Sequence, residues 1–231
     1  MHKWFCVDLA CIDYAEAHRL QRDLAAARHA GLVDRDVALV LEHPPVFTLG
    51  RRGGMDNLTV PPDALRERGI SVIQAERGGN VTYHGPGQLI VYLIVHLERL
   101  GLGVTEFVGS MEEVMIRAAG DWEINAERND INRGVWVGDR KLGSIGIAVR
   151  RGVTFHGLAL NVDVDLTPFD WINPCGLQGV RMTSLAKETK GSVDGNKVRA
   201  SIKHHLEQVF GIELAMTSRA EMERLSAPFE E

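Results

Sequence analysis

The chain has 231 residues, of which 45% are hydrophobic and 25% are charged, and its formal net charge is -5. This composition supports one good core, and no Ser-, Pro- or Gly-rich stretch separates two halves, so a second domain is not expected. The negative charge argues against general nucleic-acid binding. The sequence has no run of about eighteen apolar residues that would indicate a membrane span, and no segment that is typical of a secretory signal.

We therefore expect a single domain over residues 1–231, with its core at about 36–210 and a peripheral tail at about 211–231. Three cysteines, Cys6, Cys11 and Cys175, form no Cys-x-x-Cys pair, and every disulfide scheme leaves one of them unpaired. This usage fits a reducing compartment and predicts a cytoplasmic protein. We expect Cys6 and Cys11 to pack in the core, and we predict no metal site.

The amino-terminal half alternates strands and helices. Residues 3–9 predict a strand, and Asp13 then caps a helix that stops at Gly31. The next strand, residues 36–42, ends at the sequence His-Pro-Pro. A short helix follows at 61–69, and strands are predicted at 71–75 and 89–95, with a glycine-rich loop between them.

The carboxyl-terminal half begins with a helix at 105–119, in which Met111 and Met115 share an apolar stripe and are interpreted as core residues. Residues 135–137 and 142–149 predict a hairpin, followed by a strand at 153–164 and a helix at 192–210. We expect the charged tail to be a surface helix. Together these elements predict an α/β (α+β) fold with a mixed, largely antiparallel sheet flanked by helices, rather than a doubly wound parallel sheet.

The glycine-rich loop at 77–88 reads Arg-Gly-Gly-Asn-Val-Thr-Tyr-His-Gly-Pro-Gly-Gln. Gly-Pro-Gly alone is a common turn signature, so a structural turn is the simpler interpretation. The density of hydrogen-bonding side chains favours a ligand site instead; these are Arg77, Asn80, Thr82, Tyr83, His84 and Gln88. The spacing matches neither a phosphate-binding Gly-x-x-x-x-Gly-Lys-Ser/Thr loop nor a dinucleotide-binding Gly-x-Gly-x-x-Gly turn, which disfavours ATP and NAD.

Cys175 lies in a bend that contains proline and glycine, where we expect an exposed thiol. Only the thiolate is a good nucleophile, and a free thiol with a pKa of about 8.5 is a few per cent ionised at neutral pH. A reactive Cys175 therefore needs a cation beside it, which Lys141, His84 or His156 could supply. Each of these three, taken alone, is more readily interpreted as structural or solvated, so the choice stays open on this argument.

Four motifs occur in order along the chain: Arg-Gly-Gly-x-x-Thr-Tyr-His-Gly-Pro-Gly-Gln at 77–88, Lys-x-Gly-Ser-Ile-Gly at 141–146, His-Gly-Leu-Ala at 156–159 and Asn-Pro-Cys-Gly at 173–176. In these motifs the sequence resembles the octanoyltransferase family, also called lipoyl(octanoyl) transferases or lipoate-protein ligase B. The resemblance is strongest over residues 43–185 and weaker in the C-terminal helices. It implies a fold shared with biotin and lipoate protein ligases.

The resemblance further implies an octanoyl-[acyl-carrier-protein]:protein N-octanoyltransferase that catalyses the first step of endogenous protein lipoylation without a cofactor. The donor would be octanoyl-acyl carrier protein, and the acceptors would be lysines in lipoyl domains of 2-oxoacid dehydrogenase complexes and in the glycine cleavage H protein. Cys175 would form an acyl thioester, and Lys141 would lower its pKa and shuttle protons. The substrate pocket would be lined by Arg77, Gly78, Gly79, Asn80, Val81, Thr82, Tyr83, His84, Ser144, Ile145, Gly146, Gly157, Leu158 and Ala159.

Three other functions remain open. An ATP-dependent lipoate or biotin ligase would use the same fold without needing Cys175, and a non-catalytic acyl-binding or carrier-docking protein would carry Cys175 incidentally. A cysteine hydrolase would pair Cys175 with His84 or His156 and deliver the acyl group to water.

One segment, residues 133–151, holds five basic residues against the single acid Asp139; they are Arg133, Arg140, Lys141, Arg150 and Arg151. This group would be either the solvated face of a strand pair or a docking patch for an acidic partner such as acyl carrier protein. We expect the protein to be a monomer.

Overall fold

The computed structural model describes residues 2–129, 132–172 and 180–227, and Cys175 lies outside these ranges. The described chain forms a nine-stranded sheet in the order β12-β1-β2-β6-β10-β9-β8-β7, with β11 paired to β9. The strands are β1 (His2–Cys11), β2 (Val37–Glu42), β6 (Gln88–Ile94), β7 (Glu127–Arg128), β8 (Val135–Val137), β9 (Arg140–Arg150), β10 (Val153–Asn161), β11 (Arg181–Met182) and β12 (Ile212–Met216).

The pairing within this sheet is mixed. β1 runs parallel to β2 and β12, whereas the ladders from β2 through β6, β10, β9, β8 and β7 are antiparallel. A smaller sheet has the order β4-β3-β5, with strands β3 (Val46–Leu49), β4 (Ser71–Gln74) and β5 (Val81–His84). The prediction of a mixed, largely antiparallel sheet flanked by helices is therefore confirmed.

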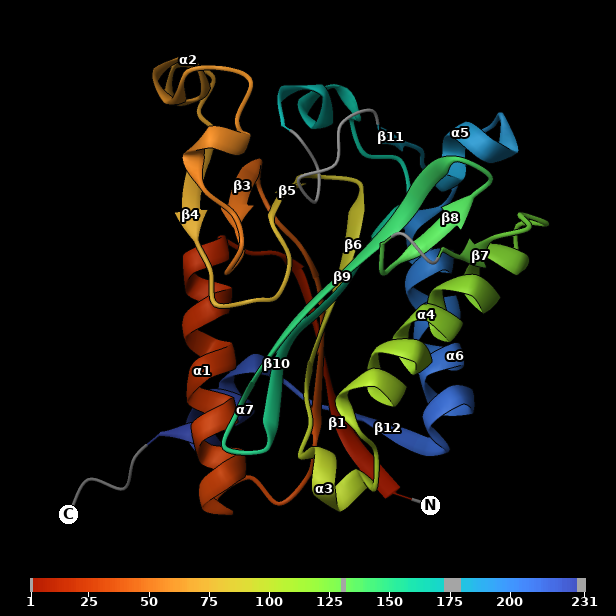
Figure 1. Cartoon of the computed structure of the whole chain (residues 1–231). Coiled ribbons are helices and arrows are strands. Elements are labelled where there is room, and N and C mark those ends of the chain that lie inside the picture. The colour runs from red at the N-terminus through yellow and green to blue at the C-terminus, as the bar shows by residue number, and fades with distance from the viewer. Residues whose placement is uncertain (1, 130–131, 173–179, 228–231) are drawn as a thin grey trace.

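Helices cover both faces of the large sheet (Figure 1). α1 (Tyr14–Ala30) and α7 (Arg219–Ser226) pack on one face, where Leu20, Leu24 and Met222 join the core. α4 (Val104–Gly120) and α6 (Gly195–Phe210) pack on the other, through residues such as Met111 and Ile202. Because both faces are covered, all residues of β6 and β10 are buried. β6 is an apolar run, whereas β10 also buries the polar residues Thr154, His156 and Asn161.

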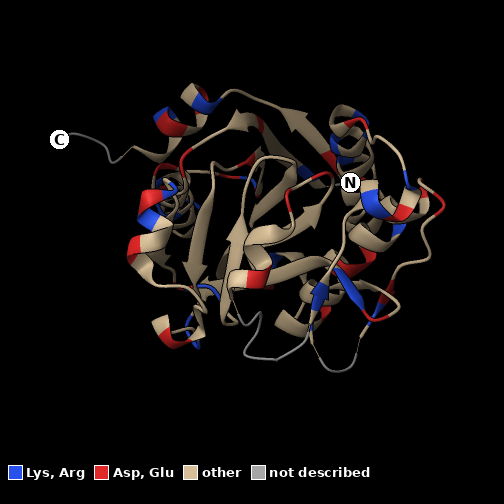
Figure 2. Ribbon diagram, turned by 90° about the horizontal axis from the view of Figure 1, so that it is seen from above, with Lys and Arg blue, Asp and Glu red and all other residues tan. Residues whose placement is uncertain are grey.

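The remaining elements are short. They are the helices α2 (Pro62–Glu67), α3 (Leu97–Leu100) and α5 (Leu185–Thr189) and the 3-10 turns η1 (Met55–Asn57) and η2 (Thr167–Trp171). Most charged residues lie on the outer helices and loops, where both signs are interspersed (Figure 2). Within the described ranges, no helix is both long and apolar enough to cross a bilayer.

Several elements were predicted correctly from capping and helix-terminating residues in the sequence. Asp13 caps α1 by accepting hydrogen bonds from the N–H groups of Ala15 and Glu16, and Gly31 ends the helix in the left-handed conformation. β3 was not predicted, because the prolines before it indicated only the end of a strand. The segment expected to be a loop contains β5, which pairs with β3.

Two further expectations differ from the structure. The tail after α6 is not one surface helix, because β12 first pairs with β1 at the sheet edge and, among the described residues of the tail, only α7 is helical. Cys6 is buried as expected, whereas Cys11 is exposed at the end of β1. The apolar pattern that predicted burial of both cysteines stops before Cys11, where the ladder to β2 becomes irregular.

Candidate functional site

A pocket opens between the small sheet and the centre of the large sheet, and we call it the central pocket. Its empty space, including the part that is open to solvent, is about 540 Å³. It is lined by Tyr14, Arg77, Gly78, Gly79, Asn80, Val81, Thr82, His84, Ile90, Tyr92, Lys141, Ser144, Ile145, Gly146, His156, Gly157, Leu158 and Ala159.

The structure therefore brings three of the four sequence motifs to one cavity. Among the described residues assigned to the substrate site from sequence, Tyr83 alone is absent from the lining. Its ring instead packs between Phe47 and Phe169, at centroid distances of 5.3 and 5.5 Å. Cys175 lies outside the described residues.

Sequence reasoning did not assign Tyr14, Ile90 and Tyr92 to the pocket. Tyr14 starts α1, and the other two lie within the apolar run of β6, so each carries the ordinary signal of a core residue. A tyrosine within an otherwise aliphatic strand is the one hint, because its hydroxyl needs a partner. Tyr92 finds that partner in His43, 2.7 Å from its hydroxyl, whereas the buried hydroxyl of Tyr14 has no partner among the described residues.

Lys141 is the lysine of this lining, and only 2% of it is exposed. Its Nζ donates a hydrogen bond to Oδ1 of Asn132 at 2.7 Å and lies 5.4 Å from the centroid of the Trp136 ring. A buried ammonium requires such compensation, since an uncompensated charge in the interior is costly. The side chain is thus held in a defined position at the pocket wall.

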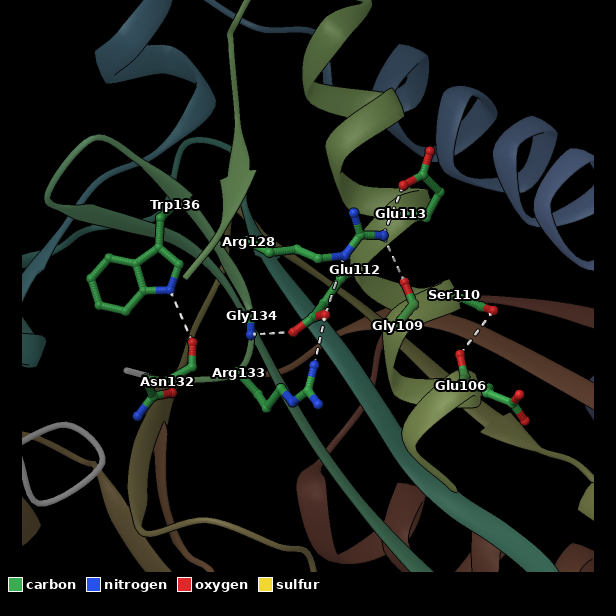
Figure 3. A network of polar contacts seen from close by, with 10 residues as sticks. All are labelled: Glu106, Gly109, Ser110, Glu112, Glu113, Arg128, Asn132, Arg133, Gly134 and Trp136. Atoms are coloured by element: carbon green, nitrogen blue, oxygen red, sulfur yellow. Dashed lines mark hydrogen bonds and ion pairs between the residues drawn. The ribbon is translucent and has the colours of Figure 1, made fainter. Parts of the chain in front are cut away.

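The position of Asn132 depends on the buried carboxylate of Glu112 in α4 (Figure 3). This carboxylate accepts the N–H of Gly134 at 3.0 Å, and Arg133 approaches it at 3.4 Å. Arg128 contacts the same carboxylate at 3.5 Å. Glu112 therefore fixes the segment that presents Asn132 to Lys141.

The chain that follows Cys175 in sequence is attached to the strand that carries Lys141. β11 pairs in parallel with β9, with Met182 opposite Lys141. The N–H of Thr183 then donates to the carbonyl oxygen of Lys141 at 2.9 Å. These bonds hold Met182 and Thr183 beside Lys141.

A second polar network begins at Arg77, whose side chain is directed into the protein. The guanidinium donates to the carbonyl oxygen of Thr48 at 2.5 Å and to its hydroxyl at 2.8 and 3.1 Å. The Thr48 hydroxyl lies 3.4 Å from Nε2 of His84. Arg77 thus supplies a fixed positive charge, while its hydrogen bonds join β3 to the loop that precedes β5.

The network continues from His84 into the large sheet. Nδ1 of His84 bonds to Oε1 of Gln88 at 2.7 Å, and Gln88 donates to Oδ1 of Asn161 at 2.9 Å. Asn161 donates in turn to the carbonyl oxygen of Thr183 at 2.9 Å. A continuous chain of polar contacts therefore links Arg77 to the residue that bonds to Lys141, which couples the two sides of the pocket.

Three buried histidines lie in or near this network; they are His43, His84 and His156. Burial is the main cause of a lowered pKa in all three histidines. It lowers the pKa of His43 to about 4 and that of His156 to about 3, and it holds the pKa of His84 well below its usual value. All three are neutral at pH 7. They can accept or relay hydrogen bonds, but as neutral imidazoles they do not provide a cation for a thiolate.

His156 adopts an unusual backbone conformation. Its φ of 61° is in the left-handed region, although it lies within β10, and its N–H donates to Oε1 of Gln21 at 2.7 Å. Such a conformation costs about 1 to 3 kcal/mol and persists only where its surroundings enforce it. The next residue must be glycine, because a Cβ on Gly157 would lie 2.0 Å from the carbonyl oxygen of Val91.

These lowered pKa values predict a loss of stability in mild acid. Each histidine is neutral when folded but takes up a proton below about pH 6.5 when unfolded, so the free energy of unfolding falls as the pH drops. We expect His43 and His156 each to contribute a loss of about 2 kcal/mol between pH 7 and 5. Urea unfolding at both pH values should show this loss, and His43→Gln should reduce it by about 2 kcal/mol.

The matched control is His29→Gln, which changes an exposed histidine of α1 and should leave the pH dependence unchanged. An equal loss of stability in the wild type and in His43→Gln would contradict the assignment.

The five basic residues of segment 133–151 do not form one patch. Arg133 contacts Glu112, Arg140 forms a two-bond pair with Glu188, and Lys141 is buried. Arg150 lies at the far end of β9, roughly 30 Å from Arg140 by the rise per residue of a strand. The five basic residues therefore do not form the single docking patch that was one of the two interpretations from sequence, because Arg140 and Arg150 lie at opposite ends of β9.

The fold and this pocket define a catalytic domain of a known class. The model of the lipoyl protein ligase A/B catalytic domain matches residues 13–207. Octanoyltransferases from Desulfotalea psychrophila and Syntrophobacter fumaroxidans are 48% and 45% identical to the chain; the alignments cover 90% and 91% of this chain and 94% and 92% of theirs. The chain belongs to the octanoyltransferase family, as its four motifs predicted.

The fold of the chain is also similar to that of solved structures. A bi-partite lipoate protein ligase from Thermoplasma acidophilum matches with a TM-score of 0.77 at 17% identity, covering 98% of this chain and 91% of that one. Lipoate-protein ligase A bound with ATP matches with a TM-score of 0.75 at 15% identity, covering 97% and 92%. The prediction of a fold shared with lipoate protein ligases is confirmed.

Proposed function

We propose that this protein transfers an octanoyl or lipoyl group from acyl carrier protein to the side-chain amine of a lysine in lipoyl domains, through a thioester on Cys175. The observation that carries the proposal is the buried side-chain amine of Lys141 in a pocket whose other walls include Val81, Ile90 and Leu158. An acyl chain needs such an apolar lining, and the chemistry needs one proton-transferring group beside it.

In the first half-reaction the thiolate of Cys175 attacks the carbonyl carbon of the donor thioester. The bond to the carrier sulfur breaks, and the ammonium of Lys141 gives that sulfur its proton. One thioester replaces another, so the step is nearly balanced and needs no ATP. Lys141 is left as a neutral amine, which prepares it for the second half.

In the second half-reaction the substrate lysine must lose a proton before it can attack, and neutral Lys141 accepts that proton. The amine then forms the amide bond, the bond to Cys175 breaks, and the remaining amine proton passes to solvent. The enzyme returns to a thiolate and an ammonium. Backbone N–H groups can stabilise the oxyanion in both halves, although that of Gly78 is already bonded to the carbonyl oxygen of Ile147 at 2.8 Å.

The proposal includes the remaining expectations from sequence. We infer a cytoplasmic monomer in which residues 1–231 form one catalytic domain, with the glycine cleavage H protein and the lipoyl domains of 2-oxoacid dehydrogenase complexes as acceptors. The lipoyl domain is supported as an acceptor class by the Thermoplasma acidophilum protein, whose structure was described together with its E2 lipoyl domain.

Intact-protein mass spectrometry tests the covalent step. After mixing with octanoyl-acyl carrier protein, we expect one octanoyl adduct that hydroxylamine removes, and no adduct on Cys175→Ala. The matched control is Cys11→Ala, because Cys11 is an exposed thiol that could be acylated non-specifically. That variant should retain the adduct.

The ATP-dependent alternative is tested by the same protein and donor. We expect turnover without ATP and no pyrophosphate when ATP is added. Full turnover of Cys175→Ser, or pyrophosphate release, would contradict the thioester mechanism, and octanoate as the main product would favour a hydrolase.

A further inference from the structure

Two histidines and a carboxylate from distant parts of the sequence meet beside the central pocket. Among the residues that the structure describes, His18, Glu76 and His156 are the group whose ligand atoms all lie within 4.8 Å of one another. His18 comes from α1, Glu76 lies between β4 and β5, and His156 lies on β10. Their sequence separations exceed any local metal-binding spacing, so the sequence alone predicted no site here.

Hydrogen bonding within the group leaves one ligand atom unused. Nε2 of His18 lies 2.6 Å from Oε2 of Glu76, so these two ligand atoms are paired with each other. Nε2 of His156 is buried and has no hydrogen-bond partner among the described residues, and only 1% of this residue is exposed. A buried polar atom without a partner is costly. Nε2 of His156 lies close to two further groups that can bind a metal ion, so an ion between the three could act as its partner.

From this arrangement we propose that His18, Glu76 and His156 bind a divalent transition-metal ion such as Zn²⁺. Two imidazoles and one carboxylate are a common ligand set for such ions, which also leaves a position for water. Two nitrogen ligands favour a transition metal over Ca²⁺ or Mg²⁺, because the latter prefer oxygen ligands.

The geometry requires only a modest adjustment. Each bond to the ion is about 2.0 to 2.2 Å, so two ligand atoms on one ion lie at most about 4 Å apart. The rings of His18 and His156 are stacked with an interplanar angle of 20°, and His18 must rotate to point its nitrogen at the ion. The side chains of His18 and Glu76 are 17% and 43% exposed, so the core does not block this rotation.

The surroundings hold the third ligand rigidly. The backbone N–H of His156 donates to Oε1 of Gln21 at 2.7 Å, and His156 is almost fully buried. The neighbouring positive charge of Arg77 opposes a cation, but its guanidinium hydrogen bonds are directed to Thr48 and to the carbonyl oxygen of Gly78. Glu76 supplies the compensating negative charge.

The full chain, treated with a chelator and then titrated with Co²⁺, tests this site, because bound Co²⁺ has visible absorption that reports its ligands. We expect one equivalent to bind, Zn²⁺ to displace it, and Zn²⁺ to raise the melting temperature by joining three elements. His18→Ala and Glu76→Gln should each weaken binding by more than about 100-fold, beyond the usual effect of losing an outer-shell partner.

The matched control is His29→Ala, which removes an exposed histidine from the same helix and should bind Co²⁺ as the wild type does. Melting curves without metal verify that each variant is folded. The proposal is overturned if no Co²⁺ binds, if affinity is unchanged in both His18→Ala and Glu76→Gln, or if the spectrum shows thiolate ligation, which would place the ion on a cysteine. Because binding is measured directly, failure here is independent of the proposed acyl transfer.

Discussion

Replacing Lys141 by methionine is expected to lower acyl transfer by about a thousandfold, within the range typical of losing a general acid–base group. Methionine keeps the apolar stem beside Trp136 but carries no proton to give to the carrier thiol or to take from the acceptor lysine. The loss should fall on kcat rather than KM, since the proposed role of Lys141 is proton transfer at the reacting atoms. Steady-state kinetics with octanoyl-acyl carrier protein and a lipoyl domain measure it.

The same substitution should leave the fold intact. Replacing a buried charge by an apolar side chain of similar volume is often neutral for stability, because the cost of burying the charge disappears as well. We expect the melting temperature to change by only a few degrees. Lys3→Met is the matched control, because it makes the same chemical change at an exposed position of β1 and should not affect turnover. Turnover of Lys141→Met within tenfold of wild type would refute the assigned role.

Gly134→Ala is expected to be strongly destabilising. An added Cβ would lie 2.3 Å from the carbonyl oxygen of Gly143 and 2.9 Å from Cε of Lys141, and the φ of 123° already disfavours a side chain. The contact with the backbone cannot be relieved by a rotamer change. We therefore expect a loss of about 3 kcal/mol or more in the free energy of unfolding, measured by urea denaturation.

A matched variant separates the two causes. Gly138 lies in the turn of the same hairpin, has a φ of 58°, and has open space around its missing Cβ. Gly138→Ala should therefore show the conformational cost alone, about 1 kcal/mol. Equal losses for the two variants would mean that the close approach of Gly134 to Gly143 has no energetic consequence. Residual folded Gly134→Ala should also transfer acyl groups slowly, because the clash displaces Lys141.

Elements with strong local signals were predictable from the sequence. α1 carries both a capping aspartate and a terminating glycine, and β6 is an apolar run because both of its faces are covered. β3, β5 and β12 are short, and each is stabilised by a partner distant in sequence, which no local pattern reports. The fold class could thus be predicted from the sequence, whereas the short strands β3, β5 and β12 could not.

The same distinction holds for the candidate site. Glycine-rich motifs identified most of the pocket lining, because those segments are unusual wherever they occur. The positioning of Lys141 was not predictable: it depends on Asn132, and through the adjoining backbone on Glu112 in α4. Likewise, His18 and Glu76 have no motif, and only the folded chain brings them to His156.

The pairing of β1 with β12 has a consequence for synthesis of the protein. His2 lies opposite Ile212, so the outer edge of β1 stays without its partner until about 210 residues later in the chain have emerged. At roughly 5 to 20 residues per second, that delay is on the order of 10 to 40 s. An unpaired strand edge is a template for association with other chains. Nascent chains that stop before residue 212 should therefore aggregate more readily than the finished protein.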